Sequence, residues 1–144
     1  MAETQDFANH KRYVMGYHVI LFAMMVILLG WSVKGVIDGV TMGSIARLIG
    51  TMALVLTAFY ARGFALQAQN RIIRLEEQLR MAAVLPAELK GRIGELQVPQ
   101  FVALRFAPDA ELPDLVRRVL AGELSTQDSI KRAIKHWRGD FTRV

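Results

Sequence analysis

Cysteine is absent from this chain of 144 residues, and charge is nearly absent from about a third of it. Without cysteine, disulfide scaffolds and thiolate metal sites are excluded. Between residues 13 and 61 only Lys34, Asp38 and Arg47 are charged, whereas the chain from Arg62 onward holds 14 basic and 10 acidic residues. This uneven distribution argues against a single water-soluble globule and against disorder. It predicts a small membrane protein with a polar helical extension.

The first apolar segment, residues 15–33, contains 19 residues and no Asp, Glu, Lys or Arg. At ~1.5 Å per residue a helix of this length spans about 28 Å, close to the hydrocarbon thickness of a bilayer. Tyr13 and Tyr17 lie at its start and Trp31 near its end, as interfacial aromatic residues do. No small-residue cleavage site follows, and a second apolar segment comes soon after. We therefore expect a retained transmembrane helix rather than a cleaved signal peptide.

A second span is predicted over residues 45–61, although its uncharged part has only 14 residues. Arg47 and Arg62 lie at its two ends, where their side chains can reach the lipid head groups. Residues 34–44 contain three glycines and are expected to form the loop of a helical hairpin.

The distribution of Lys and Arg predicts the orientation of this hairpin. Lys11 and Arg12 precede the first span, within an N-terminal segment of residues 1–12. Further arginines follow the second span: Arg62, Arg71, Arg74 and Arg80. Because positive residues favour the cytoplasmic side, both termini are expected in the cytoplasm, and the chain is expected in a bacterial inner membrane.

The second span is expected to continue as one helix through residues 62–85, because Pro86 is the first firm helix stop. One face of this helix carries small or apolar residues about 3.6 positions apart. We call this face the stripe, and it comprises Gly50, Ala53, Thr57, Ala61, Ala65, Ala68, Ile72, Leu75 and Leu79. Small residues in lipid permit close helix approach, and larger aliphatic residues in water gain by burial.

Two interpretations of the stripe remain open at this point. It can pack within one chain, against the first span and the tail helices, or it can pair with a parallel second copy. From Ala65 to Ala82 the spacing follows a coiled-coil heptad. With Ile72 at position a, Arg71 occupies position g and Glu76 the following position e, the pair that bridges two parallel chains.

The remaining residues, 86–144, predict a small cytoplasmic domain of about four short helices. These are expected at residues 86–97, 99–107, 113–121 and 125–137. In the last, Ser125 is the expected cap with Asp128 as its partner, and the inner face comprises Ile130, Ala133, Ile134 and Trp137. No segment alternates with period two, so no sheet is expected. The predicted fold is an all-α membrane protein: a transmembrane hairpin, a long helical extension and a small helical bundle.

Several segments together resemble a family of small bacterial two-span membrane proteins known only as a domain of unknown function. They are NHKRYVMGYH before the first span, RIIRLEEQLR after the second, and then LPAEL, VALRFAPDAELPDLVRRVL and IKRAIKHWRGDFTRV. The most specific parts are LRFA…ELP…VRR and AIK-x-W-R-x-D. This resemblance covers nearly the whole chain and implies the same architecture and a bacterial origin. It supplies no activity, cofactor or catalytic residue.

No zinc-protease H-E-x-x-H, P-loop, G-x-S-x-G or dinucleotide-binding fingerprint occurs in the sequence, so we expect no enzyme and assign no catalytic residue, metal or cofactor. His18 is the one weak candidate for a cofactor ligand, because a histidine within a span is a functional hypothesis by default. Facing imidazoles from two chains could hold a haem. An interfacial, hydrogen-bonding histidine is the simpler alternative.

A basic surface is predicted near the end of the chain, comprising Lys131, Arg132, Lys135, Arg138 and Arg143. Beside a membrane such a surface suits anionic lipids. Nucleic acid is not an expected partner, because no nucleic-acid-binding motif accompanies the charge. The leading expectation is a non-catalytic membrane-anchored interaction module, an accessory or scaffold subunit that forms a homo-oligomer or joins a larger membrane complex. Haem binding through His18 and anionic-lipid binding are the alternatives.

Overall fold

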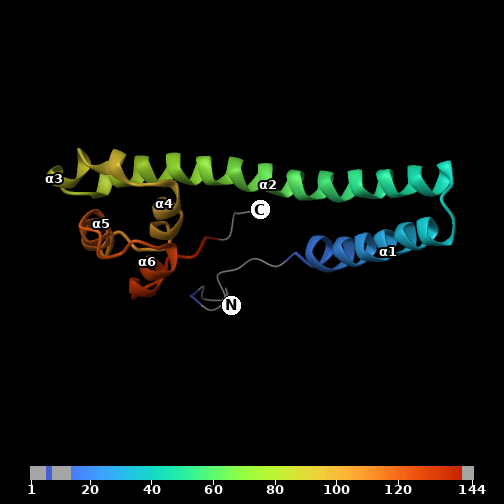
Figure 1. Ribbon diagram of the computed structural model, residues 1–144. Coiled ribbons are helices and arrows are strands. Elements are labelled where there is room, and N and C mark those ends of the chain that lie inside the picture. The colour runs from blue at the N-terminus through green and yellow to red at the C-terminus, as the bar shows by residue number, and fades with distance from the viewer. Residues whose placement is uncertain (1–5, 8–13, 141–144) are drawn as a thin grey trace. The chain divides into compact units, whose positions relative to one another are not determined.

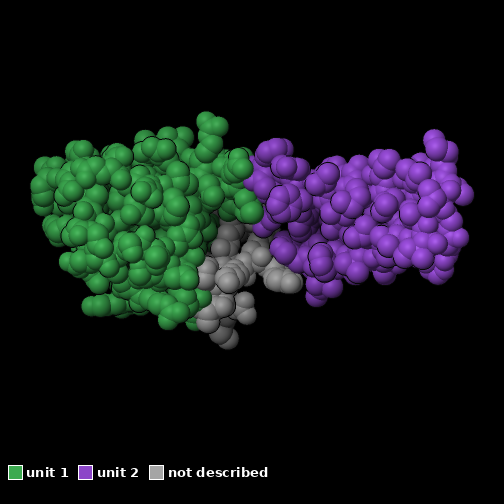
Figure 2. Space-filling view, viewed as in Figure 1, with its two compact units in different colours: residues 1–11, 66–144 green, residues 12–65 purple. Residues whose placement is uncertain are grey.

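A computed structural model describes residues 6–7 and 14–140, and every regular element in these residues is helical (Figure 1). The expected all-α fold is therefore confirmed for this part of the chain. The elements are the π-helical η1 (Gly16–Leu21), α1 (Phe22–Asp38), α2 (Met42–Val84), α3 (Ala87–Lys90), the 3₁₀-helical η2 (Ile93–Glu95), α4 (Val98–Leu104), α5 (Leu112–Leu120) and α6 (Gln127–Ala133). The chain divides into two compact units, residues 12–65 and residues 1–11 with 66–144 (Figure 2).

Two helical segments are long and apolar enough to cross a membrane, Gly16–Asp38 and Met42–Val84. The connection between them is shorter than the loop expected at residues 34–44, since only residues 39–41 lie outside helices. Two local interactions explain the difference. Lys34 forms an ion pair with Asp38 one turn later, which extends α1. Thr41 and Ser44 then exchange side-chain to backbone N–H hydrogen bonds of 3.1 and 2.9 Å, which cap the start of α2.

Within the unit of residues 12–65, α1 packs along the first half of α2 through a few polar contacts. The hydroxyls of Ser32 and Thr51 lie 2.8 Å apart and are buried. Near the opposite end of α1, the Tyr17 hydroxyl donates to the Ala58 carbonyl oxygen at 2.8 Å. The Arg47 guanidinium lies against Gly35, where a Cβ atom would collide with it. Hydroxyl pairs and small residues of this kind hold helices together where apolar burial gives little gain.

The second half of α2 and the short helices enclose one hydrophobic core (Figure 1). Phe101, Leu104, Phe106 and Met81 are completely buried at its centre. The predicted stop of the third short helix is confirmed: α5 ends at Leu120, and Gly122 follows with φ +81°, a conformation that favours glycine. Burial of Leu112, Leu115, Val116 and Val119 orients α5 toward the core.

Two short helices differ from the sequence expectation. The helix expected at residues 86–97 is broken into α3 and η2, with Gly91 and the bend at Arg92 between them. The cap of α6 is Thr126 and not Ser125: the Thr126 side chain accepts from the Ser129 N–H at 3.1 Å, and Ser129 replaces the expected partner Asp128. Thr126 and Ser129 satisfy the same capping-box pattern one residue later.

Candidate functional site

Eight of the nine stripe residues are exposed and Ala65 is half-buried. The largest are the most exposed, since Ile72, Leu75 and Leu79 have exposed fractions of 57%, 60% and 67%. Of the two interpretations left open, packing within one chain is therefore not supported for most of the stripe. Thr57 and Ala61 are the exception, because they lie at the edge of an apolar groove of about 590 Å³ between α1 and α2.

The faces of α2 that pack inside the chain are not the stripe, and they carry buried polar side chains. Toward α1 the buried side chains are Ser44 and Thr51, whose hydroxyls form hydrogen bonds there. Toward the short helices they are Ile73, Glu77 and Met81, at 6%, 5% and 0% exposure. A buried polar group requires partners that only the chain interior supplies. The glycine and alanines of the stripe have no polar side chain with such a requirement.

In the second half of α2 the stripe forms a continuous apolar edge, which we call the seam and define as Ala68, Ile72, Leu75 and Leu79. At ~100° per residue, the seam lies about 170° around α2 from the face that contains Ile73, Glu77 and Met81. The seam is thus on the far side of the helix from the core of its own unit.

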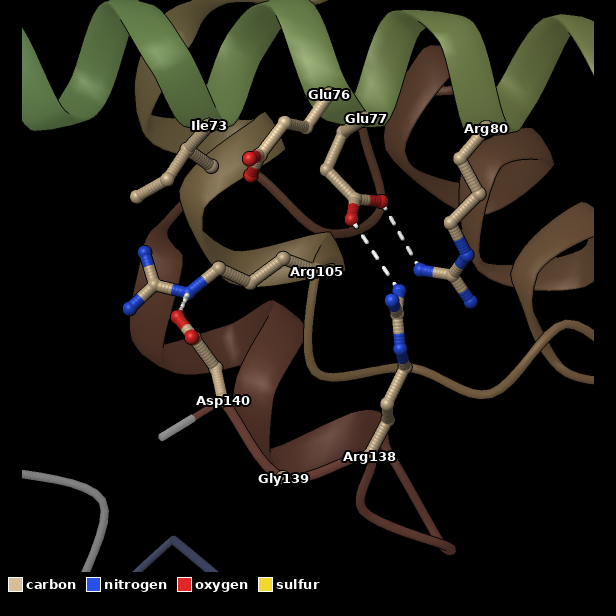
Figure 3. A pocket seen from close by; sticks show the side chains of 8 residues that line it. All are labelled: Ile73, Glu76, Glu77, Arg80, Arg105, Arg138, Gly139 and Asp140. Atoms are coloured by element: carbon tan, nitrogen blue, oxygen red, sulfur yellow. Dashed lines mark hydrogen bonds and ion pairs between the residues drawn. The ribbon is translucent and has the colours of Figure 1, made fainter. Parts of the chain in front are cut away.

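Directly behind the seam, Glu77 lies between two arginines (Figure 3). Its Oε2 accepts from Arg80 Nη1 at 2.9 Å, and its Oε1 lies 3.4 Å from Arg138 Nη1. Arg138 comes from the segment after α6, and its backbone N–H donates to the Phe106 carbonyl oxygen at 2.7 Å. The carboxylate therefore fastens the end of the described chain to α2.

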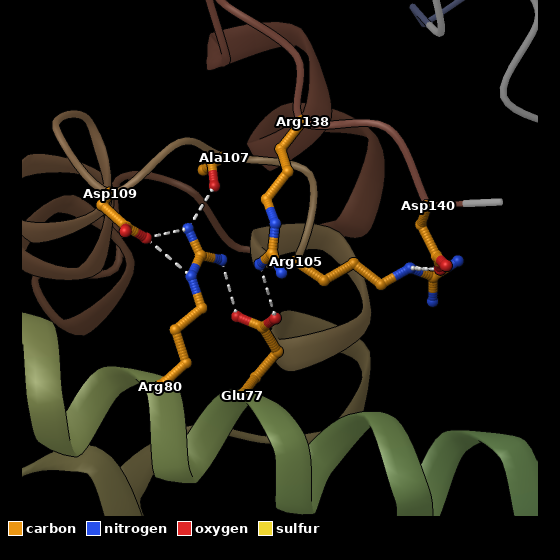
Figure 4. A network of polar contacts seen from close by, with 7 residues as sticks. All are labelled: Glu77, Arg80, Arg105, Ala107, Asp109, Arg138 and Asp140. Atoms are coloured by element: carbon orange, nitrogen blue, oxygen red, sulfur yellow. Dashed lines mark hydrogen bonds and ion pairs between the residues drawn. The ribbon is translucent and has the colours of Figure 1, made fainter. Parts of the chain in front are cut away.

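The same cluster extends to the turn after α4 (Figure 4). Arg80 donates to Asp109 Oδ1 from Nε at 2.8 Å and from Nη2 at 2.6 Å, and also donates to the Ala107 carbonyl oxygen at 2.7 Å. On the other side, Arg105 Nε lies 2.9 Å from Asp140 Oδ2. Through these hydrogen bonds Arg80 joins α2 to the residues between α4 and α5.

These charged side chains line a pocket of about 530 Å³ (Figure 3). Its lining comprises three arginines, three carboxylates, Ile73 and Gly139, so its formal charges balance. Burial raises the pKa of Glu77, and the charges and hydrogen bond of Arg80, followed by Arg138, lower it only in part. Five of its six charged groups form ion pairs with one another, and Glu76 forms none in the described part of the chain. These ion pairs hold α2, the end of α4 and the segment after α6 together.

A second carboxylate, that of Glu111, holds the segment after α6 in place. The Glu111 carboxylate accepts from the backbone N–H groups of Lys135 and His136 at 2.9 and 3.0 Å, and lies 2.7 Å from His136 Nδ1. Desolvation would raise the pKa of Glu111, but the hydrogen bonds from Lys135 and His136 outweigh it and lower the pKa. This contact ends α6 at Ala133 and turns the chain back toward α4.

The predicted basic surface is not a single surface in the described part of the chain. Lys131 is buried at 8% exposure, with its Nζ 5.9 Å from the centre of the Phe106 ring. Arg132 stacks on Phe7, and Arg138 pairs with Glu77. Of the other two predicted members, Lys135 is exposed and Arg143 lies outside the described residues. The inner face predicted for this helix did not include Lys131, which α6 presents to the core next to Ile130.

His18 lies in η1 and is half-buried. Its Nδ1 lies 3.1 Å from the carbonyl oxygen and 3.2 Å from the nitrogen of Val14, and its ring packs edge-on against Tyr17. Among the described residues no group of three or more His, Cys, Asp or Glu side chains gathers as a metal site. His10, Lys11, Arg12 and Tyr13 lie outside the described residues.

A family model described as "Family of unknown function (DUF6526)" matches residues 1–144, the whole chain. The chain belongs to this family. The resemblance stated from the sequence, to a family of unknown function, is thereby confirmed. No curated protein and no solved structure matches the chain.

The cluster around Glu77 in this DUF6526 protein was not predicted from its sequence. A signal for it was present, because Ile73, Glu77 and Met81 recur every four residues on one helix face. A carboxylate in the middle of an apolar row is a candidate for a buried ion pair. The stripe contains more small and apolar residues than this row, so it is the stronger pattern in the sequence.

Proposed function

We propose that this DUF6526 protein is a non-catalytic, membrane-anchored interaction module, an accessory or scaffold subunit at the inner membrane of a bacterium. The observation that carries the proposal is the exposed seam. Ile72, Leu75 and Leu79 remain 57–67% exposed on a helix that already uses its opposite face to complete a core. Contiguous exposed aliphatic residues of this kind mark interaction surfaces.

The free energy available at the seam is substantial for so small a unit. Covering an exposed Leu or Ile side chain contributes about 1–2 kcal/mol when somewhat more than half of it was in water. A partner that covers three such side chains gains several kcal/mol in all, before the cost of association. The unit already has its own core, so the seam is not needed for its folding.

The exposure of α1 and of the first half of α2 supports a membrane anchor. In their most apolar stretches only 6% and 11% of the residues are buried, whereas the core helix of a soluble protein is mostly buried. Trp31 is 61% exposed beneath the guanidinium of Arg47, a pairing typical of the lipid–water boundary. Under this proposal both termini are cytoplasmic and residues 39–41 face the opposite side.

The test of this function compares two substitutions on exposed positions of α2 one residue apart. Leu75→Arg places a charge on the seam, and Arg74→Glu changes a charge off the seam. The full chain, extracted in mild detergent, is expected in an assembly larger than a monomer, and Leu75→Arg is expected to reduce that assembly several-fold while Arg74→Glu leaves it intact. Size-exclusion chromatography with light scattering measures both. A strict monomer, or equal effects of the two substitutions, contradicts the proposal.

A further inference from the structure

We infer that the seam binds a second copy of this chain, with the two α2 helices parallel and in register. This inference rests on the proposed function, because it names the partner of the same surface. Its basis is the pair of charged residues that flank the seam, Arg71 and Glu76, together with the exposure of the seam itself.

Arg71 and Glu76 differ from the other charged residues near them. Both are exposed, and neither has an ion pair or hydrogen bond within the part of the chain that the structure describes. By contrast, Glu77 and Arg80, on the same stretch of α2, are paired inside the unit. Glu76 also borders the pocket around Glu77, but its side chain remains exposed and forms no ion pair there. Arg71 and Glu76 are therefore available to a partner.

The spacing of these two residues requires two helices. Five residues apart, they lie about 140° from each other around one helix, so they do not meet within one chain. With Ile72 and Leu79 at position a and Leu75 at position d, Arg71 is at g and Glu76 at the next e. Across a parallel, in-register pair, g of one helix lies beside e of the other, which gives two symmetric Arg–Glu pairs.

The orientation of the pair follows from the membrane anchor. Copies anchored in one membrane with the same orientation have parallel α2 helices, the arrangement in which position g of one helix lies beside position e of the other. In an antiparallel pair, positions g face g and positions e face e, so Arg71 and Glu76 would not meet.

The seam alone is shorter than the three to four heptads that make a coiled coil stable. Confinement of two copies to one membrane converts their association into a reaction at high effective concentration, which offsets the small area. The full, membrane-anchored chain is therefore the form in which the pairing is expected and must be tested.

The decisive experiment is a charge exchange in the full chain. Two differently tagged copies are co-expressed, extracted in mild detergent and captured through one tag, and the recovered fraction of the other tag is measured. R71E and E76R each replace two attractive pairs with two like-charged pairs, so each is expected to lower recovery about fivefold. The double variant R71E/E76R is expected to restore recovery, as is co-expression of R71E with E76R, because both combinations recreate opposite charges. R74E is the control and should recover like the parent, and Trp137 fluorescence checks that each variant is folded.

Unchanged recovery in both single variants overturns the inference, and so does a loss that neither the double variant nor the mixed pair restores. If Leu75→Arg still disassembles the protein while the charge exchange has no effect, the seam binds a different partner. In that case the proposed function survives and only the second copy is rejected.

Discussion

Glu77 connects α2 to the segment after α6 through a buried carboxylate. Its side chain is only 7% exposed, and it contacts arginines from α2 and from the segment after α6. Burying a carboxylate costs free energy that its partners offset, and the raised pKa of Glu77 records this cost. Removing the carboxylate leaves Arg80, whose side chain is 12% exposed, without one of its acceptors.

We therefore predict that Glu77→Ala destabilises the unit by about 2–3 kcal/mol. The matched control is Glu95→Ala, since Glu95 also pairs with an arginine three residues away but in water, with both side chains about half exposed. No measurable change is expected there. Urea unfolding followed by Trp137 fluorescence, in a Trp31→Phe background, measures both. Equal losses for the two variants would show that the cluster around Glu77 contributes no more than a surface pair.

At the scale of single elements, α6 shows how a short helix depends on its first residue. The helix has seven residues, yet it supplies the buried Ile130 to the core. A helix this short has little stability of its own. The hydrogen bonds between Thr126 and Ser129 therefore account for much of its local order.

Thr126→Ala is expected to cost about 1 kcal/mol of unfolding free energy, because it removes the acceptor for the Ser129 N–H. Ser125→Ala, at the exposed position where the sequence alone predicts the cap, is expected to have no effect. The same urea titration compares them. A larger loss for the Ser125 variant would place the start of α6 one residue earlier than the structure does.

The element scale also shows what the sequence could predict. The helical character of the segments and the starts of some helices followed from prolines and from apolar spacing, as α4 and α5 illustrate, because both begin beside a proline. The π-helical η1 and the 3₁₀-helical η2 were not predicted. The face of α2 that packs inside the chain could not be chosen from spacing alone. Two rows, one through Ile72 and Leu75 and the other through Ile73 and Glu77, are both regular. Only the ion pairs of Glu77 with Arg80 and with Arg138, which lies 61 residues away, decide between them.

At the scale of the whole molecule, each compact unit has a surface that water does not favour. In residues 12–65 the exposed aliphatic and aromatic side chains surround the helices, as lipid contact requires. In the other unit the large aliphatic residues of α2 that are more than half exposed, Ile72, Leu75 and Leu79, all lie on the seam, while the core is closed. Exposed apolar side chains all around the helices of residues 12–65 are suited to contact with lipid. A narrow apolar edge such as the seam is suited to contact with one partner helix.

The proposed function requires that the α1–α2 hairpin spans a membrane, with residues 39–41 on one side and the short helices α3 to α6 on the other. Because the chain has no cysteine, single cysteines report its topology without background. Val40 is 74% exposed in the connection, and Ala121 is exposed after α5. In intact bacterial host cells, a membrane-impermeant maleimide is expected to label Val40→Cys at once and Ala121→Cys only after the membrane is permeabilised. Labelling of Ala121→Cys in intact cells, or recovery of the protein in the soluble fraction, would contradict the account.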